Sequence, residues 1–296
     1  MPRGAAVLNL AKAWAFAAFL AGLFAGLGWL IGGLTSALLF ALSALLAATG
    51  VYRYGDRALL GMLGARPFAI AEDPLLRSAA DTAAARMQVR PPQLFLIDDG
   101  FPRLFVVGRG PRSSALAVST GALHALRPEE LEALIGHELA HVRRRDVLVQ
   151  TSVVLFATTL VELSRIGGWF SRVLLYVFAP IASAFVNILL SPGRELAADA
   201  LAAGATAGGA HDLADALHRL DRASELIEFA ASPATEPLYP IDPFVDEGVA
   251  RMFKTHPPLE TRLRRLRELG ATASRNGREA LSAGARTNGG HEDQFD

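Results

Sequence analysis

Residues 131–146 read LEALIGHELAHVRRRD, a short stretch with two histidines four positions apart, a glutamate between them and a run of arginines. On a helix, His137 and His141 lie one turn apart on the same side, with roughly 6 Å between their Cβ atoms. That spacing lets both imidazoles reach a single zinc ion at ~2.1 Å. Glu138 stands beside the first histidine, where it can act on a water at the metal instead of binding the metal itself. The stretch therefore predicts a zinc site built on a helix.

The residues before this stretch favour the helix. Pro128 suits the first turn of a helix, and the acidic Glu129 and Glu130 complement the positive end of its dipole. The alternative is a solvated helix face that carries two unremarkable histidines. The H-E-x-x-H order is typical of metalloproteases, and a third ligand elsewhere in the chain favours the zinc site over this alternative.

The third ligand must be a histidine or a carboxylate, because the chain has no cysteine. A catalytic zinc keeps three protein ligands and one open position. Glu195, in SPGRELAADALA, is the strongest candidate, because Pro192 and Gly193 place it in the first turn of a new helix. Asp199 follows one turn later, where it could hydrogen-bond a zinc-binding histidine. Taken alone, Glu195 would be a surface acid that compensates the helix dipole.

Residues 254–270, KTHPPLETRLRRLRELG, leave two interpretations open. His256 precedes a Pro-Pro helix start, and Arg262 lies inside the helix, which is expected to end at Gly270. In one interpretation the stretch is a helix cap followed by a basic, solvated face. In the other, His256 and Arg262 lie beside the metal and stabilise a developing oxyanion. Spacing alone does not choose between them.

Four uncharged or nearly uncharged segments indicate that the chain also enters lipid. Of all residues 51% are hydrophobic, and the mean hydropathy is positive. Residues 13–30 and 34–52 carry no charge, and each is near the ~20 residues that a helix needs to cross a bilayer. A cleaved signal peptide is the competing interpretation, but the apolar run is too long and a second one follows at once. Residues 147–163 and 173–190 are long enough to span, or could form a buried hairpin inside a large soluble domain.

Basic residues near the ends of these segments predict an orientation. The loop between the first two segments, with its Gly32-Gly33 turn, has no basic residue, which favours placing it outside the cytoplasm. Arg165 and Arg172, between the last two segments, count weakly against the same placement of the second loop. We expect a multi-pass protein of the inner or plasma membrane, with the polar domain and both termini in the cytoplasm. The residues that favour this orientation are Arg3, Lys12, Arg53, Arg57, Arg66, Arg143, Arg144, Arg145 and Arg194.

The polar part of the chain is divided by the second hydrophobic pair. Formal charge is zero, so nothing global suggests a nucleic-acid partner. Short helices and strands are expected, namely a helix from Pro74 to about Gln88 capped by Asp73, strands at 93–97, 103–107 and 115–119, and helices around Asp199 and Leu213. The predicted organisation is a transmembrane hairpin (1–57), a first catalytic part (58–146), a second hydrophobic hairpin (147–190), a second catalytic part (191–270) and a disordered tail (271–296).

Three motifs in one order carry a family resemblance: HELAH at 137–141, RELAADA at 194–200 and THPPLETR at 255–262. Together with STGAL at 119–123 and the membrane layout, they resemble the HtpX-type integral-membrane zinc metalloproteases. These are heat-shock quality-control enzymes related to the CAAX prenyl proteases. The resemblance implies a mostly α membrane protein with about four transmembrane helices. It also implies a gluzincin α+β catalytic domain, with a small sheet whose edge strand aligns the peptide substrate.

The resemblance also implies roles for site residues. His137, His141 and Glu195 would hold one Zn²⁺ per chain, and Glu138 would be the general base. Asp199 would support a ligand, His256 would stabilise the tetrahedral intermediate, and Arg262 would help to hold the site together. The substrates would be polypeptides, above all misfolded membrane proteins.

One stretch departs from the family pattern. The family usually shows Asn-Ala-Phe-Ala shortly before a glycine, whereas residues 103–108 read RLFVVG, with Arg103 in place of the asparagine. The departure lies in the strand expected to align the substrate, so it affects specificity, but it changes no predicted metal ligand.

Two other functions are left open. A membrane-anchored interaction protein could use a structural zinc site, which would need a fourth ligand such as His256 or His124. A narrow-specificity protease could cleave one prenyl-protein or signalling peptide instead of unfolded chains. The sequence carries no signal for an oligomeric state.

Overall fold

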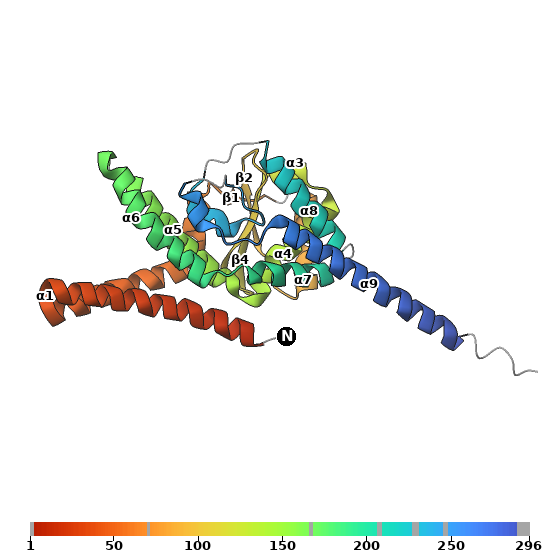
Figure 1. Ribbon diagram of the computed structural model, residues 1–296, viewed down its shortest axis with the longest axis horizontal. Coiled ribbons are helices and arrows are strands. Elements are labelled where there is room, and N and C mark those ends of the chain that lie inside the picture. The colour runs from red at the N-terminus through yellow and green to blue at the C-terminus, as the bar shows by residue number, and fades with distance from the viewer. Residues whose placement is uncertain are drawn as a thin grey trace, which may run out of the picture.

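Helix α1 (Arg3–Met62) is a hairpin of two helical limbs (Figure 1). The computed structural model describes residues 3–69, 72–165, 168–205, 209–226, 231–244 and 248–288. Gly32 and Gly33 interrupt the helix, and Gly33 takes a left-handed φ of +66°, which glycine adopts without steric cost. The limbs meet beside this turn, where a Cβ added to Gly28 would lie 2.5 Å from the carbonyl oxygen of Ser36. The predicted turn between the first two hydrophobic segments is confirmed.

A four-stranded sheet forms the centre of the polar domain. β2 pairs in parallel with β4, and β3 pairs antiparallel with β4, so β3 forms one edge. The three predicted strands are present: β2 has the predicted ends, whereas β3 and β4 have shifted ends. The two-residue β1 was not predicted because it has no alternating pattern. The strands are β1 (Arg66–Pro67), β2 (Gln93–Ile97), β3 (Leu104–Gly110) and β4 (Ser113–Ser119), in the order β1-β2-β4-β3.

Local signals account for where the helices of the polar domain begin. The side chain of Asp73 caps α2 by accepting hydrogen bonds from the amides of Leu75 and Leu76, as predicted. α4 has Pro128 at its first position and ends where Arg145 takes a left-handed φ of 64°. The helices are α2 (Pro74–Met87), α3 (Thr120–Ala125), α4 (Pro128–Arg144), α7 (Gly193–Ala205), α8 (Gly209–Ser224) and α9 (Leu259–Asn288), with 3₁₀ turns η2 (Pro233–Leu238) and η3 (Ala250–Phe253).

The second hydrophobic pair forms α5 (Asp146–Arg165) and α6 (Ser171–Leu189), joined through the 3₁₀ turn η1 (Gly168–Phe170). Within the described residues, α1, α5 and α6 are the helices long and apolar enough to cross a membrane. In the most apolar 18-residue stretch of α5, 67% of the residues are buried in protein, whereas in that of α6 only 22% are buried. The two hairpins leave the body on one side, and α9 leaves it on the other (Figure 1). The alternative of a helix buried in protein therefore describes much of α5, whereas α6 and α1 present apolar side chains outward.

The sheet has a separate apolar core on each of its faces. Leu104, Val106 and Leu116 pack into a core shared with α2, α4, α7, α8 and α9. Phe105 and Ala117, on the opposite face, belong to a core with α1, α5, α6 and η2. This alternation follows from the period of two in a strand. The zinc-motif helix and the membrane hairpins are thus fixed to opposite faces of one sheet.

The C-terminal helix corrects two predictions. α9 begins at Leu259, continues through Gly270 and ends at Asn288, whereas a helix end at Gly270 and a disordered tail from residue 271 were expected. A glycine inside a helix costs only about 1 kcal/mol relative to alanine, and the alanine, arginine and glutamate residues that follow it favour helix. Residues 289–296 of the expected tail lie outside the described part of the chain.

Candidate metal centre

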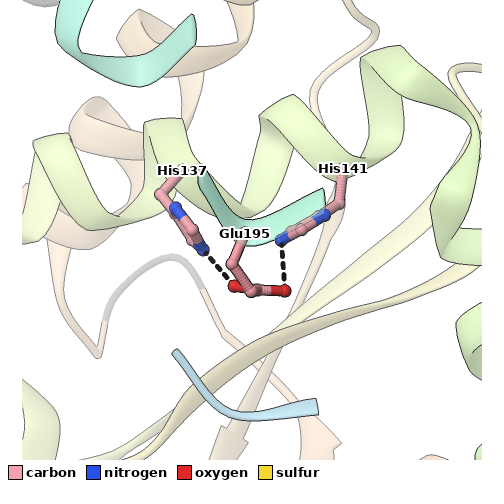
Figure 2. Close-up of side chains that lie close together, drawn as sticks. All are labelled: His137, His141 and Glu195. Atoms are coloured by element: carbon pink, nitrogen blue, oxygen red, sulfur yellow. Dashed lines mark ion pairs between the residues drawn. The ribbon is translucent and has the colours of Figure 1, made fainter. Parts of the chain in front are cut away.

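His137 and His141 project from the same side of α4, and Glu195 from α7 lies between them (Figure 2). The Nε2 atom of His137 lies 3.3 Å from one oxygen of Glu195, and the Nε2 atom of His141 lies 3.5 Å from the other. The three side chains offer ligand atoms that all lie within 4.8 Å of one another. The structure therefore brings together the three residues predicted to bind zinc.

Small side chains allow α7 to approach α4 closely enough for this convergence. Ala140 on α4 and Ala198 and Ala202 on α7 are at most 1% exposed and belong to one core. Glu195 stands in the first turn of α7, as predicted from Pro192 and Gly193. After the two histidines of α4, the chain forms α5 and α6 and then α7, which supplies the third ligand.

Asp199 and Arg262 form a buried support behind His137. Asp199 Oδ1 lies 2.9 Å from Nδ1 of His137. Arg262 donates to both oxygens of Asp199, at 2.8 and 2.7 Å, and also to the carbonyl of Pro240. Burial alone would raise the pKa of Asp199, but the guanidinium outweighs it and lowers that pKa to about 2. Asp199 is therefore an ionised acceptor that orients the His137 ring.

This arrangement corrects one interpretation of Arg262. The expectation that it stabilises an oxyanion beside the metal does not fit, because its guanidinium is directed at Asp199 and the Pro240 carbonyl. At 1% exposure, it positions Asp199 instead.

Asp146 gives His141 a corresponding support that the sequence analysis missed. Its Oδ2 atom lies 3.4 Å from Nδ1 of His141 and accepts a hydrogen bond from Arg144 at 3.3 Å. Burial lowers the pKa of His141, but Glu195 and Asp146 outweigh it and raise that pKa to about 10. The only sequence signal was an acid five residues after the second histidine, and its approach depends on the break between α4 and α5.

Glu138 lies between the zinc motif and the edge of the sheet. Its Oε2 atom accepts a hydrogen bond of 3.0 Å from the backbone amide of Val106 in β3, and the residue is 2% exposed. Burial raises the pKa of its carboxyl group. Arg103, just before the same strand, forms a 2.7 Å ion pair with Asp99. The candidate base therefore faces the strand that the resemblance assigns to substrate alignment.

His256 is also brought to the site, and His124 is not. The Nε2 atom of His256 lies 3.7 Å from Glu195 Oε2, and its Nδ1 atom lies 2.7 Å from Glu236 Oε1. His124 is exposed at the end of α3, outside the group of ligand atoms. Glu236 was missed because η2 has no sequence pattern that marks it.

The residues present fit a zinc ion. Two imidazole nitrogens and one carboxylate form the ligand set of many catalytic zinc sites, which leave a fourth position open. The Nε2 atom of His137 is buried and makes no hydrogen bond within the described part of the chain, so a cation would satisfy it. Carboxylates lie 2.9 and 3.4 Å from Nδ1 of His137 and His141, and Nε2 of each ring lies beside Glu195.

Comparison with known proteins places this site in a family. Residues 71–270 match Peptidase family M48. The Protease HtpX homolog of Pelotomaculum thermopropionicum is 34% identical over 277 residues, covering 88% of this chain and 98% of that protein. The Protease HtpX homolog of Pyrococcus abyssi is 32% identical, covering 85% and 93%. The crystal structure of S. mikatae Ste24p is similar with a TM-score of 0.45 and 17% identity, covering 88% of this chain and 65% of that one.

The family match includes both ligand-bearing helices, and the relatives are matched over nearly their whole length. It confirms the resemblance to the HtpX-type proteases and the prediction of a membrane-bound zinc metalloprotease that acts on polypeptides. The chain belongs to peptidase family M48.

Proposed function

We propose that this metalloprotease is an endopeptidase of the cytoplasmic membrane face, with His137, His141 and Glu195 as zinc ligands and Glu138 as general base. One observation carries the proposal: three buried ligand atoms converge within 4.8 Å, and Glu138 follows the first ligand directly in the chain. A closed structural site would need a fourth ligand, whereas this group has three.

Zinc, Glu138 and the carboxylates behind the histidines would have separate roles in peptide-bond hydrolysis. A bound zinc would polarise the scissile carbonyl and lower the pKa of a water toward neutrality. Glu138 would take a proton from the attacking water and pass it to the leaving amine. Asp199 and Asp146 would keep the two histidine rings oriented.

The edge of the sheet supports a polypeptide substrate in extended conformation. Two outward-facing amides of β3 are held by side chains: Val106 donates to Glu138 and Gly108 donates to Thr151 of α5 at 3.0 Å. An added strand pairs with such an edge through its main chain and therefore needs little side-chain specificity. Because both of these amides already have partners, a substrate strand would pair with the part of β3 before Val106.

The membrane segments support substrates that come from the bilayer. The first limb of α1 is tied to the end of the zinc-motif helix, since Asn9 donates to the carbonyl of Arg144 at 3.2 Å. Lys12 in the same limb donates to the carbonyl of Leu189 at the end of α6, at 3.4 Å. The basic residues that flank these ends favour the cytoplasmic side. Misfolded membrane proteins are therefore the substrates that we propose.

The test compares wild type, Glu138→Gln and a control, Glu129→Gln, each purified in detergent. Glu129 is exposed on the same helix, so its variant controls for a changed charge on α4. We expect zinc in all three proteins, and cleavage of an unfolded membrane protein by wild type and control. The rate for Glu138→Gln should be lower by about 10²–10⁴-fold. Cleavage by Glu138→Gln at the wild-type rate, or absence of zinc from wild type, would contradict the proposal.

A further inference from the structure

A buried carboxylate outside the ligand set lies behind His256. Glu236, in η2, is 1% exposed. It accepts hydrogen bonds from the amide and hydroxyl of Thr255, at 3.0 and 2.8 Å, and its Oε1 atom lies 2.7 Å from Nδ1 of His256. Burying a carboxylate is costly unless it is paired and hydrogen-bonded, so these partners account for its place in the interior.

The segment that carries Glu236 is fixed to the elements around the metal ligands. The carbonyl of the next residue, Pro237, accepts hydrogen bonds from Gln150 of α5 and from Arg194 of α7, both at 2.8 Å. Arg194 precedes Glu195, and its Nε atom lies 3.1 Å from that carboxylate. The position of Glu236 is therefore set by the same helix that supplies the third ligand.

We propose that Glu236 is a positioning residue: it holds His256 so that the Nε2 atom of the ring faces the reacting carbonyl. The inference rests on the proposed protease function. Nδ1 of His256 is occupied by Glu236, and Nε2 is left facing the metal group, 3.7 Å from Glu195. The same relation holds for the two ligand histidines, whose Nδ1 atoms meet Asp199 and Asp146.

The pairing matters most when negative charge develops on the substrate. A ring whose Nδ1–H is held by Glu236 has its remaining nitrogen pointed at the site, where a proton on Nε2 would be donated in a hydrogen bond to the carbonyl oxygen. A donor aimed in advance at that oxygen stabilises the transition state more than the bound substrate. Glu236 itself touches neither substrate nor metal, so it acts only through His256.

The experiment uses Glu236→Gln, His256→Gln and the double variant of the full-length zinc-loaded protein. The readouts are kcat, KM, zinc content and the thermal midpoint. We expect Glu236→Gln to lower kcat by about 10–100-fold, with zinc content and KM nearly unchanged. In the His256→Gln background the same change should have no further effect on kcat, because residues that act as one unit are not additive.

Thr255→Val provides the matched control. It removes the other side-chain hydrogen bond to Glu236 but leaves the His256 contact in place. We expect it to lower the thermal midpoint and to lower kcat by less than Glu236→Gln does, because the His256 contact remains. Should Glu236→Gln fail to fold, Glu236→Asp keeps the charge, shortens the side chain by one methylene and should give a smaller loss of kcat.

Two results would overturn the inference: equal loss of kcat from Glu236→Gln with and without His256, or full activity of Glu236→Gln in folded protein. A second measurement is independent of turnover. Binding of a phosphinic peptide, a mimic of the tetrahedral intermediate, should weaken by about 10-fold or more in Glu236→Gln while a matched ordinary peptide binds as before. Unchanged phosphinic-peptide binding would also overturn it. Failure of the proposed protease function is a different result, because Glu138→Gln would then cleave at the wild-type rate.

Discussion

At the scale of single residues, the site repeats one arrangement three times. In each case a buried carboxylate faces Nδ1 of a histidine, and Nε2 of that histidine lies within 3.7 Å of Glu195. The carboxylates therefore set the ring orientations before any metal or substrate binds. The three pairs are Asp199 with His137, Asp146 with His141, and Glu236 with His256.

The Asp199 pair gives a prediction about stability. Replacing Arg262 by methionine leaves Asp199 buried, at 2% exposure, without its counter-charge. Removing one partner of a buried ion pair typically costs about 3–5 kcal/mol. We expect Arg262→Met to lower the free energy of unfolding by that order and to weaken zinc binding, because His137 loses its fixed orientation. Thermal unfolding in detergent and competition with a zinc chelator would measure both effects.

The control for this prediction is Arg264→Met, an exposed arginine on the same helix. It should change the midpoint by little, since surface substitutions rarely exceed about 0.5 kcal/mol. Equal effects of the two substitutions would show that the ion pair has no special role.

At the scale of elements, the sequence predicts the helices that local patterns determine, but not the segments whose position depends on tertiary contacts. The zinc-motif helix and the first hairpin follow from spacing and from runs of apolar residues, both of which are local. Glu195 was found because Pro192 and Gly193 mark a helix start. Glu236 could not be found in this way, because it lies in a 3₁₀ turn whose place depends on contacts with Gln150 and Arg194. The helical course beyond Gly270 was missed because a single glycine was taken as a helix end.

The hairpin in α1 gives a prediction at this scale. A side chain at Gly28 would meet the backbone of Ser36 in the opposite limb, whereas one at Gly26 would meet nothing within 4 Å. We expect Gly28→Val to destabilise the hairpin, by about 1–3 kcal/mol as for other overpacked sites. Gly26→Val, with the same helix propensity, is the matched control. Equal thermal midpoints of the two variants in detergent would count against the close contact of the limbs.

At the scale of the whole molecule, the two hairpins leave the body on one side, and the basic residues at their ends predict which side is cytoplasmic. The chain has no cysteine, so single-cysteine variants can be labelled without background. We expect Thr35→Cys and Arg172→Cys, at the far ends of the hairpins, to react with an impermeant thiol reagent applied to intact cells. Ser78→Cys and Arg264→Cys, in the polar domain, should react only after the membrane is opened. The reverse pattern would invert the proposed orientation.

The order of the ligands along the chain also affects when the enzyme becomes active during synthesis. Two ligands lie on α4, and the third lies on α7, after the whole of α5 and α6. A ribosome that has released the H-E-x-x-H helix must therefore still make the second hairpin before Glu195 exists. His256, which we place at the oxyanion, emerges later still. The nascent chain thus cannot hold all three zinc ligands until the second hydrophobic hairpin, α5 and α6, has been made.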